Sequence, residues 1–152
     1  MTLIRSDFEH LLALRTSLRR FLHWSEHQAK AAGITPAQHR LLLAIKGHPD
    51  PAGPTIGDVA NHLVLRHHSA VGLIDRAAAA GLVTRAPDRA NNSTVRVALT
   101  DTGDEKLDDL TAAHLEELEH LAPAMRSLWR ALEADGAAAI RTVALTPVPN
   151  PG

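Results

Sequence analysis

Apolar residues recur at the three- and four-residue spacing of a helix along most of the chain. From Arg5 to Ala32 no residue breaks a helix, and Gly33 then offers a C-terminal stop. The pattern therefore predicts a long first helix. Its apolar stripe consists of Phe8, Leu11, Leu12, Leu18, Leu22 and Ala29.

A second helix begins at a strong start signal. Thr35 can cap it with a hydroxyl, Pro36 suits the first helical position, and the Gln38 amide can return a hydrogen bond to the cap. The core face of this helix is formed by Leu41, Leu42 and Ile45. Glycines and prolines between residues 47 and 54 end it in a loop.

Two short helices and two strands are predicted in the middle of the chain. A third helix runs from about Gly57 to Val64, and a fourth begins near His67 and is capped by Gly81. Residues 82–86 and 94–99 then have strand patterns. The turn-forming segment 87–93 joins the two strands as a hairpin.

The C-terminal part predicts two further helices. Thr100 or Asp101 caps the first, which runs toward Leu121. Pro123 starts or kinks the last helix, which contains Trp129 and extends over Ile140 toward Val143. The tail, residues 146–152, is predicted to be disordered.

This order of elements predicts a mainly α fold with a small β-hairpin wing. Two short helices a few residues apart, followed by a two-stranded ribbon with an arginine at its tip, are typical of a winged helix-turn-helix. The terminal helices carry more apolar surface than one small neighbour covers, so we expect a second copy of the chain to cover it. The alternative is a monomer whose terminal helices fold back over the middle. The predicted organisation is a dimerisation helix over 1–34, a DNA-binding domain over 35–100, dimerisation helices over 101–145 and the tail over 146–152.

Composition excludes several classes of protein. Without cysteine, the chain has no disulfides, no thiolate metal site and no cysteine nucleophile. It contains no glycine-rich phosphate loop and no HExxH or GxSxG motif, so we expect neither an enzyme nor a bound cofactor. No apolar run reaches the roughly 20 residues that span a bilayer, and residues 1–10 lack the apolar stretch of a signal peptide. These features predict a soluble cytoplasmic protein.

The charges are unevenly distributed although the net charge is −1. Between residues 55 and 97 five arginines stand against three aspartates, with three histidines in addition. Between residues 101 and 135 ten acids stand against three bases. The middle of the chain is therefore the electrostatically plausible place for a polyanion, although an acidic solvated helix after an ordinary domain would give the same asymmetry.

The polar start of the fourth helix and the hairpin carry the candidate DNA contacts. A helix N-terminus favours phosphate or base edges, and Gly72 permits close approach to a surface. Arg76 could bind a phosphate or pair with Asp75 or another acid. Arg89 at the hairpin tip is the candidate for a minor groove, with Asp88 orienting it. The candidates taken from the residues alone are Arg66, His67, His68, Ser69, Gly72, Arg76, Arg85, Arg89 and Arg96.

Four segments, in this order and spacing, carry a resemblance to a known family: TPAQHRLLLAI, PTIGDVANHL, LRHHSAVGLIDRAAAAGLV and VRVALTDTG. The chain resembles the MarR family of bacterial winged-helix transcriptional regulators from about Arg5 to Leu145. The resemblance implies a homodimer built from the terminal helices, a recognition helix starting near His67 and a wing from about Val83 to Leu99. It also implies a pseudo-palindromic operator in double-stranded DNA and a repressor that a small ligand, often an aromatic or phenolic anion, releases.

The wing departs from the family pattern. An acidic residue and one or two arginines usually stand about eight residues before the pair that corresponds to Leu99 and Thr100, and here this register falls on Asn91, Asn92 and Ser93. Asp88 and Arg89 lie three residues earlier. Asn91 and Asn92 therefore join the candidate DNA contacts, and Gly72 stands where many relatives have a longer polar side chain.

Effector residues are suggested by their chemistry, because an aromatic wall with a cationic partner suits a planar anion. The candidates are His23, Trp24, His39 and Arg40; the alternative is that Trp24 packs in the dimer core and Arg40 pairs with an acid.

Two other functions stay open. His23 and His27 lie four residues apart and could bind zinc or copper with His114 or a carboxylate, as in a metal-responsive regulator. The other alternative is a winged helix that binds only protein. Added salt weakens DNA binding steeply, whereas it would weaken the binding of such a protein partner only slightly.

Overall fold

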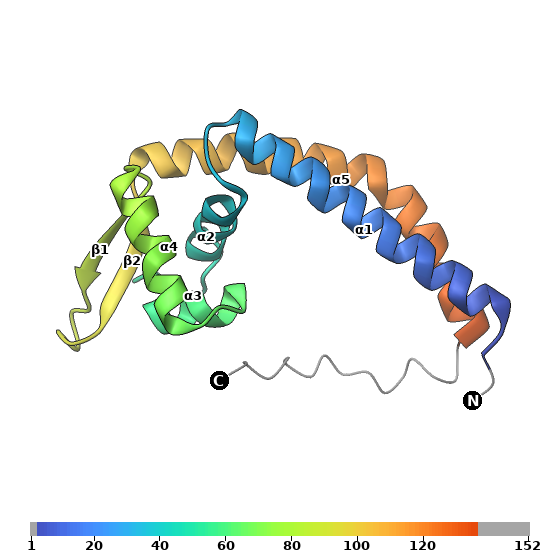
Figure 1. The fold of residues 1–152 in the computed structure, drawn as a ribbon, viewed down its shortest axis with the longest axis horizontal. Helices are drawn as coiled ribbons and strands as arrows, with labels where there is room; N and C mark the ends of the chain where they lie inside the picture. Colours follow the sequence, from blue (N-terminus) through green and yellow to red (C-terminus); the bar gives the residue numbers. More distant parts are fainter. Residues whose placement is uncertain (1–2, 137–152) are drawn as a thin grey trace. The chain divides into compact units, whose positions relative to one another are not determined.

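The computed structural model describes residues 3–136. Within these residues five helices and one antiparallel hairpin follow one another (Figure 1), which confirms the predicted fold class. The elements are α1 (Arg5–Ala31), α2 (Pro36–Lys46), α3 (Ile56–Leu63), α4 (His67–Ala79), β1 (Val83–Pro87), β2 (Val95–Leu99) and α5 (Asp101–Gly136). No helix within the described range is long and apolar enough to cross a membrane.

One predicted boundary is wrong. Pro123 lies inside α5, which continues as one helix to Gly136, so no new helix starts there. The other predicted outcome, a kink at Pro123, stays a prediction. A proline inside a helix removes one hydrogen bond and costs about 3 kcal/mol or more. Strong helix formers on both sides, among them Leu121, Ala122, Ala124 and Met125, favour continuation of the helix. Ile140, Val143 and the tail lie outside the described residues.

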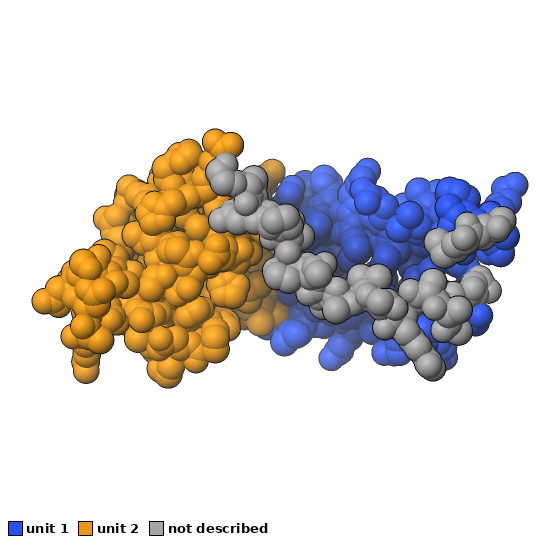
Figure 2. Space-filling view, turned by 90° about the horizontal axis from the view of Figure 1, so that it is seen from below, with its two compact units in different colours: residues 1–27, 112–148 blue, residues 28–111, 149–152 orange. Residues whose placement is uncertain are grey.

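The described residues divide into two compact units (Figure 2). Unit 1 comprises residues 3–27 and 112–136, and unit 2 comprises residues 28–111. In unit 1 the second part of α5 runs beside α1 (Figure 1). The contact includes the ring of His114 at 4.8 Å from that of Trp24 and the Ser25 hydroxyl at 2.7 Å from His114 Nε2.

Unit 1 leaves large apolar side chains exposed on both of its helices. On α1 they are five of the six residues of the stripe predicted from the sequence, the sixth, Ala29, being buried, and on α5 they lie in the described part before Gly136. These residues are Phe8, Leu11, Leu12, Leu18, Leu22, Leu115, Leu118 and Trp129. Exposed apolar area of this extent on two packed helices is typical of an interface.

Unit 2 contains the buried core. Side chains of α2, α3, α4, the hairpin and the start of α5 meet there. The largest fully buried ones are Leu41, Leu42, Val59, Ile74, Leu82, Val97 and Leu107. In the hairpin Val83 pairs with Leu99 and Pro87 with Val95. A short bridge between Thr55 and Arg96 adds the segment before α3 to the free edge of β2, so that the wing is anchored to the helices.

Both α2 and α3 begin with a capping box, and in α3 the box contains a titratable group. The Asp58 carboxylate accepts the backbone N–H of Thr55 at 2.9 Å, and the Thr55 hydroxyl accepts the N–H of Asp58 at 3.1 Å. The hydrogen bond from the Thr55 backbone holds the pKa of Asp58 below its usual value. The stabilisation that ionised Asp58 contributes is therefore fully present above the usual carboxyl pKa of about 4. It is lost as the pH falls through the lower pKa of Asp58 in the folded protein.

We expect Asp58→Asn to lower the free energy of unfolding by about 0.3–1 kcal/mol at pH 7, because the amide oxygen can still accept the Thr55 N–H but the negative charge near the helix N-terminus is lost. Below pH 4 the difference from the parent protein should shrink, because protonation removes the same charge from Asp58. Urea unfolding at pH 7 and pH 3 measures both values. The matched control is Gln38→Ala, which removes the equivalent side chain of the α2 box. Gln38 does not titrate, so a shrinkage of equal size in that variant would contradict the assignment to Asp58.

Candidate nucleic-acid interface

Helices α3 and α4 form a helix-turn-helix in unit 2. The turn between them reverses at Val64, which has left-handed backbone angles of φ 53° and ψ 49°. The N–H of Leu65 donates to the carbonyl of Ala60 at 2.9 Å, which closes the C-terminal end of α3. A β-branched residue is costly in this conformation, so tertiary packing and not local propensity holds the turn.

Helix α4 has one buried and one exposed face. Ala70, Leu73, Ile74 and Ala77 are buried as the sequence pattern predicted, whereas His67, His68 and Arg76 are exposed. Arg66 occupies the N-cap, and its side chain does not cap the helix. The N-terminal N–H groups of α4 therefore lack the side-chain acceptor that α2 and α3 have.

The arginines near α4 differ in whether an acid neutralises them. Arg85 on β1 pairs with Asp75, so Asp75 is not the partner of Arg76. Arg76 makes no ion pair with any residue in the range 3–136. Its guanidinium lies against Gly72: a Cβ at that glycine would be 3.2 Å from Arg76 Nη1. The missing side chain at Gly72 therefore leaves space for an uncompensated cation.

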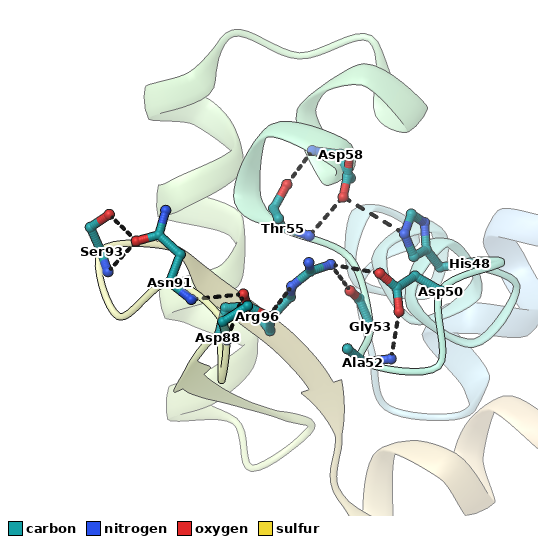
Figure 3. A network of polar contacts seen from close by, with 11 residues as sticks. His48, Asp50, Ala52, Gly53, Thr55, Asp58, Asp88, Asn91, Ser93 and Arg96 are labelled. Atoms are coloured by element: carbon teal, nitrogen blue, oxygen red, sulfur yellow. Dashed lines mark hydrogen bonds and ion pairs between the residues drawn. The ribbon is translucent and has the colours of Figure 1, made fainter.

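A polar network ties the wing to the loop before α3 (Figure 3). Arg96 Nε donates to Asp88 Oδ1 at 3.1 Å, and Arg96 Nη1 donates to Asp50 Oδ2 at 3.2 Å and to the carbonyl of Gly53 at 2.9 Å. The expectation that Asp88 orients Arg89 is wrong, because Asp88 holds Arg96. Sequence reasoning missed Asp50 and Gly53, since 46 and 43 residues separate them from Arg96.

The hairpin tip is ordered by its own side chains. The Asp88 carboxylate accepts the N–H groups of Ala90 and Asn91 at 3.2 and 3.1 Å. The Asn91 side-chain oxygen accepts the N–H and hydroxyl of Ser93 at 3.1 and 2.6 Å. These contacts occupy the side-chain oxygen of Asn91, so its NH₂ group remains to donate hydrogen bonds. Arg89 and Asn92 are exposed, and Arg89 has no ion-pair partner among the described residues.

The four candidate effector residues fall in both units. In unit 1, Trp24 stacks on Phe21 at 5.9 Å and contacts His114, and His23 lines a hollow on α1. In unit 2, His39 is 7% exposed on the core side of α2. Arg40 lines a hollow of about 290 Å³ with Leu43, Leu63 and His62 among its walls. Their role in binding an effector stays a prediction.

The predicted three-histidine set does not form. His23 and His27 are in contact, with 3.1 Å between their Nε2 atoms. The ring of His114 instead packs against Trp24 and Phe21 and contacts Ser25. Within residues 3–136, no three His, Asp or Glu side chains come together in a way that could hold a metal ion.

Comparison with known proteins places these features in a family context. Residues 32–91 match the model described as MarR family. No curated protein matches the chain in sequence. A MarR family protein from Bacillus stearothermophilus has a similar fold, with a TM-score of 0.71 and 20% identity over 89% of this chain and 98% of that one.

Two ligand-bound structures are also similar. One is a MepR mutant from S. aureus bound to an oligodeoxyribonucleotide, with a TM-score of 0.61 and 16% identity over 88% of this chain and 96% of that one. The other is CouR from Rhodococcus jostii RHA1 bound to p-coumaroyl-CoA, with a TM-score of 0.66 and 19% identity over 88% of this chain and 95% of that one. The resemblance of the chain to MarR family regulators is thus found in both sequence and fold.

Proposed function

We propose that this chain, which resembles the MarR family in residues 32–91 and in its fold, is a sequence-specific DNA-binding transcriptional regulator that acts as a repressor. The observation that carries the proposal is the pattern of charge compensation in unit 2. Arg85 and Arg96 are paired with acids, whereas Arg66, Arg76 and Arg89 make no ion pair with a described residue. Cations without acidic partners on a helix-turn-helix and at a wing tip suit a phosphate backbone.

In this proposal each element has a role on DNA. Helix α4 lies in the major groove, where His67, His68 and Ser69 approach bases or phosphates at its uncapped N-terminus. Arg89 and the asparagines at the wing tip contact the neighbouring minor groove. Arg96 positions the wing through its bonds to Asp88, Asp50 and Gly53, whereas Arg85 is neutralised by Asp75. The MepR structure with an oligodeoxyribonucleotide supports DNA as the ligand of this fold.

We infer a homodimer from the exposed apolar face of unit 1. A soluble monomer rarely leaves so many large apolar side chains exposed, and a second copy of the same two helices offers a matching surface. A two-fold dimer carries two α4 helices and therefore binds a pseudo-palindromic operator. Analytical ultracentrifugation should give twice the chain mass.

The deciding experiment is fluorescence anisotropy of the purified protein on duplex from upstream of its own gene, with random duplex as competitor, across a salt series. We expect sequence-selective binding whose affinity falls steeply with salt, because phosphate neutralisation releases counterions. A folded dimer that bound neither duplex would overturn the proposal and favour the protein-interaction alternative.

We further propose that a small molecule, an aromatic or phenolic anion, releases the DNA. CouR binds p-coumaroyl-CoA, which supports a ligand with an aromatic acyl group for this fold. The candidate contacts are His23 and Trp24 in unit 1 and His39 and Arg40 in unit 2, since each pair combines a ring with potential or fixed positive charge. Loss of the anisotropy signal on addition of hydroxycinnamates or their thioesters is the test. Failure of all of them would leave DNA binding intact and remove this ligand class.

His68→Ala should change the preference among operators more than the overall affinity. His68 is exposed in the first turn of α4, where a side chain reaches base edges. Competition against a library of single-base operator variants should show a change of about 1 kcal/mol or more at one position in each half-site. A uniform loss over all variants would instead assign His68 to the phosphate backbone.

A further inference from the structure

Two histidines on α1 lie side by side on the exposed surface of unit 1. His23 and His27 are one helical turn apart, with their ring centroids 4.6 Å apart and their planes at 83°. Their Nε2 atoms are separated by 3.1 Å. Both residues are exposed, and neither forms an ion pair with a described residue. Because each ring could bind water instead, their mutual hydrogen bond contributes little to stability.

The same arrangement brings two imidazole nitrogens to chelating distance. Zinc lies about 2.0–2.1 Å from a histidine nitrogen. For an ion at that distance from both Nε2 atoms, the observed separation gives an N–metal–N angle of about 98°. This angle lies between the values of square-planar and tetrahedral coordination, so the spacing of the two Nε2 atoms suits one shared ion once both rings turn their lone pairs toward it.

The sequence around the pair has the order of a helical zinc motif. Two histidines four residues apart on one helical face hold zinc in both the HExxH and HxxEH motifs, and residues 23–27 read His-Trp-Ser-Glu-His. Glu26 lines the same hollow on α1 as His23, and it forms no ion pair with a described residue. Arg15 and Arg19 also line this hollow. Their positive charge opposes any bound cation, so the affinity of the site has to come from the imidazole nitrogens.

We propose that His23 and His27 form a divalent-metal site that takes Zn²⁺ or Cu²⁺. Both ions favour imidazole nitrogen, whereas Mg²⁺ and Ca²⁺ favour oxygen. Two protein ligands leave the remaining coordination positions to water, so the site exchanges metal with solution and is not a structural zinc site. This inference is independent of DNA binding, because all of its residues lie on α1.

Isothermal titration of the full chain with ZnCl₂, in a buffer that does not chelate zinc, tests the site. Variant His27→Ala should bind at least about tenfold more weakly, since the second ligand of a chelate acts at a high effective concentration. The matched control is His27→Ala with Lys30→His, which restores the number of histidines but places the second one about 10 Å along the helix from His23. We expect this variant to bind as weakly as His27→Ala.

The result that overturns the proposal is equal affinity of the parent protein and the variant with the shifted histidine. A second control, His120→Ala, removes an exposed histidine from the α5 part of unit 1 and should leave the affinity unchanged. A loss in that variant as large as in His27→Ala would likewise overturn it. Circular dichroism checks that all variants keep the helix content, and the Cu²⁺ electron paramagnetic resonance spectrum should show two coordinated nitrogens only in chains that keep both His23 and His27.

Discussion

Replacing Gly103 with alanine should lower the free energy of unfolding by about 3 kcal/mol, because a methyl group would meet backbone atoms. Gly103 is buried in the first turn of α5. A Cβ there would be 2.1 Å from the carbonyl oxygen of Leu82 and 3.0 Å from its carbonyl carbon. That same oxygen accepts the N–H of Thr100 at 3.0 Å, and the Thr100 hydroxyl donates to Gly81 at 2.6 Å. Neither backbone can move without breaking these bonds.

The matched control is Gly57→Ala. Gly57 lies inside α3, and a Cβ there would meet only the Thr55 hydroxyl at 3.7 Å, which is ordinary contact. Alanine is a better helix former than glycine, so this variant should be as stable as the parent or more stable, by up to about 1 kcal/mol. Urea unfolding followed by circular dichroism measures both variants. A Gly103→Ala protein within 1 kcal/mol of the parent would mean that α5 does not approach Leu82 so closely.

Local signals were sufficient for most of the element boundaries. The start of α2 depends on Thr35 and Gln38, three residues apart, and the structure shows both hydrogen bonds of the predicted capping box. Gly33 and Gly81 end helices with positive φ, as glycines at these positions suggest. Pro123 was the exception, since the sum of favourable helix residues around it outweighs one lost hydrogen bond.

The candidate site was less predictable, because the state of each arginine depends on distant residues. The sequence shows five arginines between residues 55 and 97 but not which of them acids neutralise. Arg85 and Asp75 are ten residues apart, and Arg96 and Asp50 are 46 apart, so only the folded chain brings them together. The role of Gly103 was also hidden, since its neighbour Leu82 comes 21 positions earlier.

Arg89→Ala should weaken operator binding about tenfold or more and reduce the steepness of its salt dependence. The side chain lies at the wing tip without an ion-pair partner among the described residues, so its charge is available to DNA. Each lost phosphate contact reduces the slope of log K against log salt by about 0.9, and a dimer loses two such contacts. Because Arg89 donates no structural bond within residues 3–136, thermal unfolding of the variant should match that of the parent protein.

A double variant, Asp75→Asn with Arg85→Gln, separates this effect from a general dependence on charge. It removes an arginine of the same wing together with the acid that neutralises it, and so leaves the net charge of the protein unchanged. We expect its operator affinity to stay within about threefold of the parent, since a paired cation releases few counterions. If the double variant lost as much affinity as Arg89→Ala, or if Arg89→Ala kept the parent's affinity and salt slope, the wing tip would not be the part of the hairpin that contacts DNA.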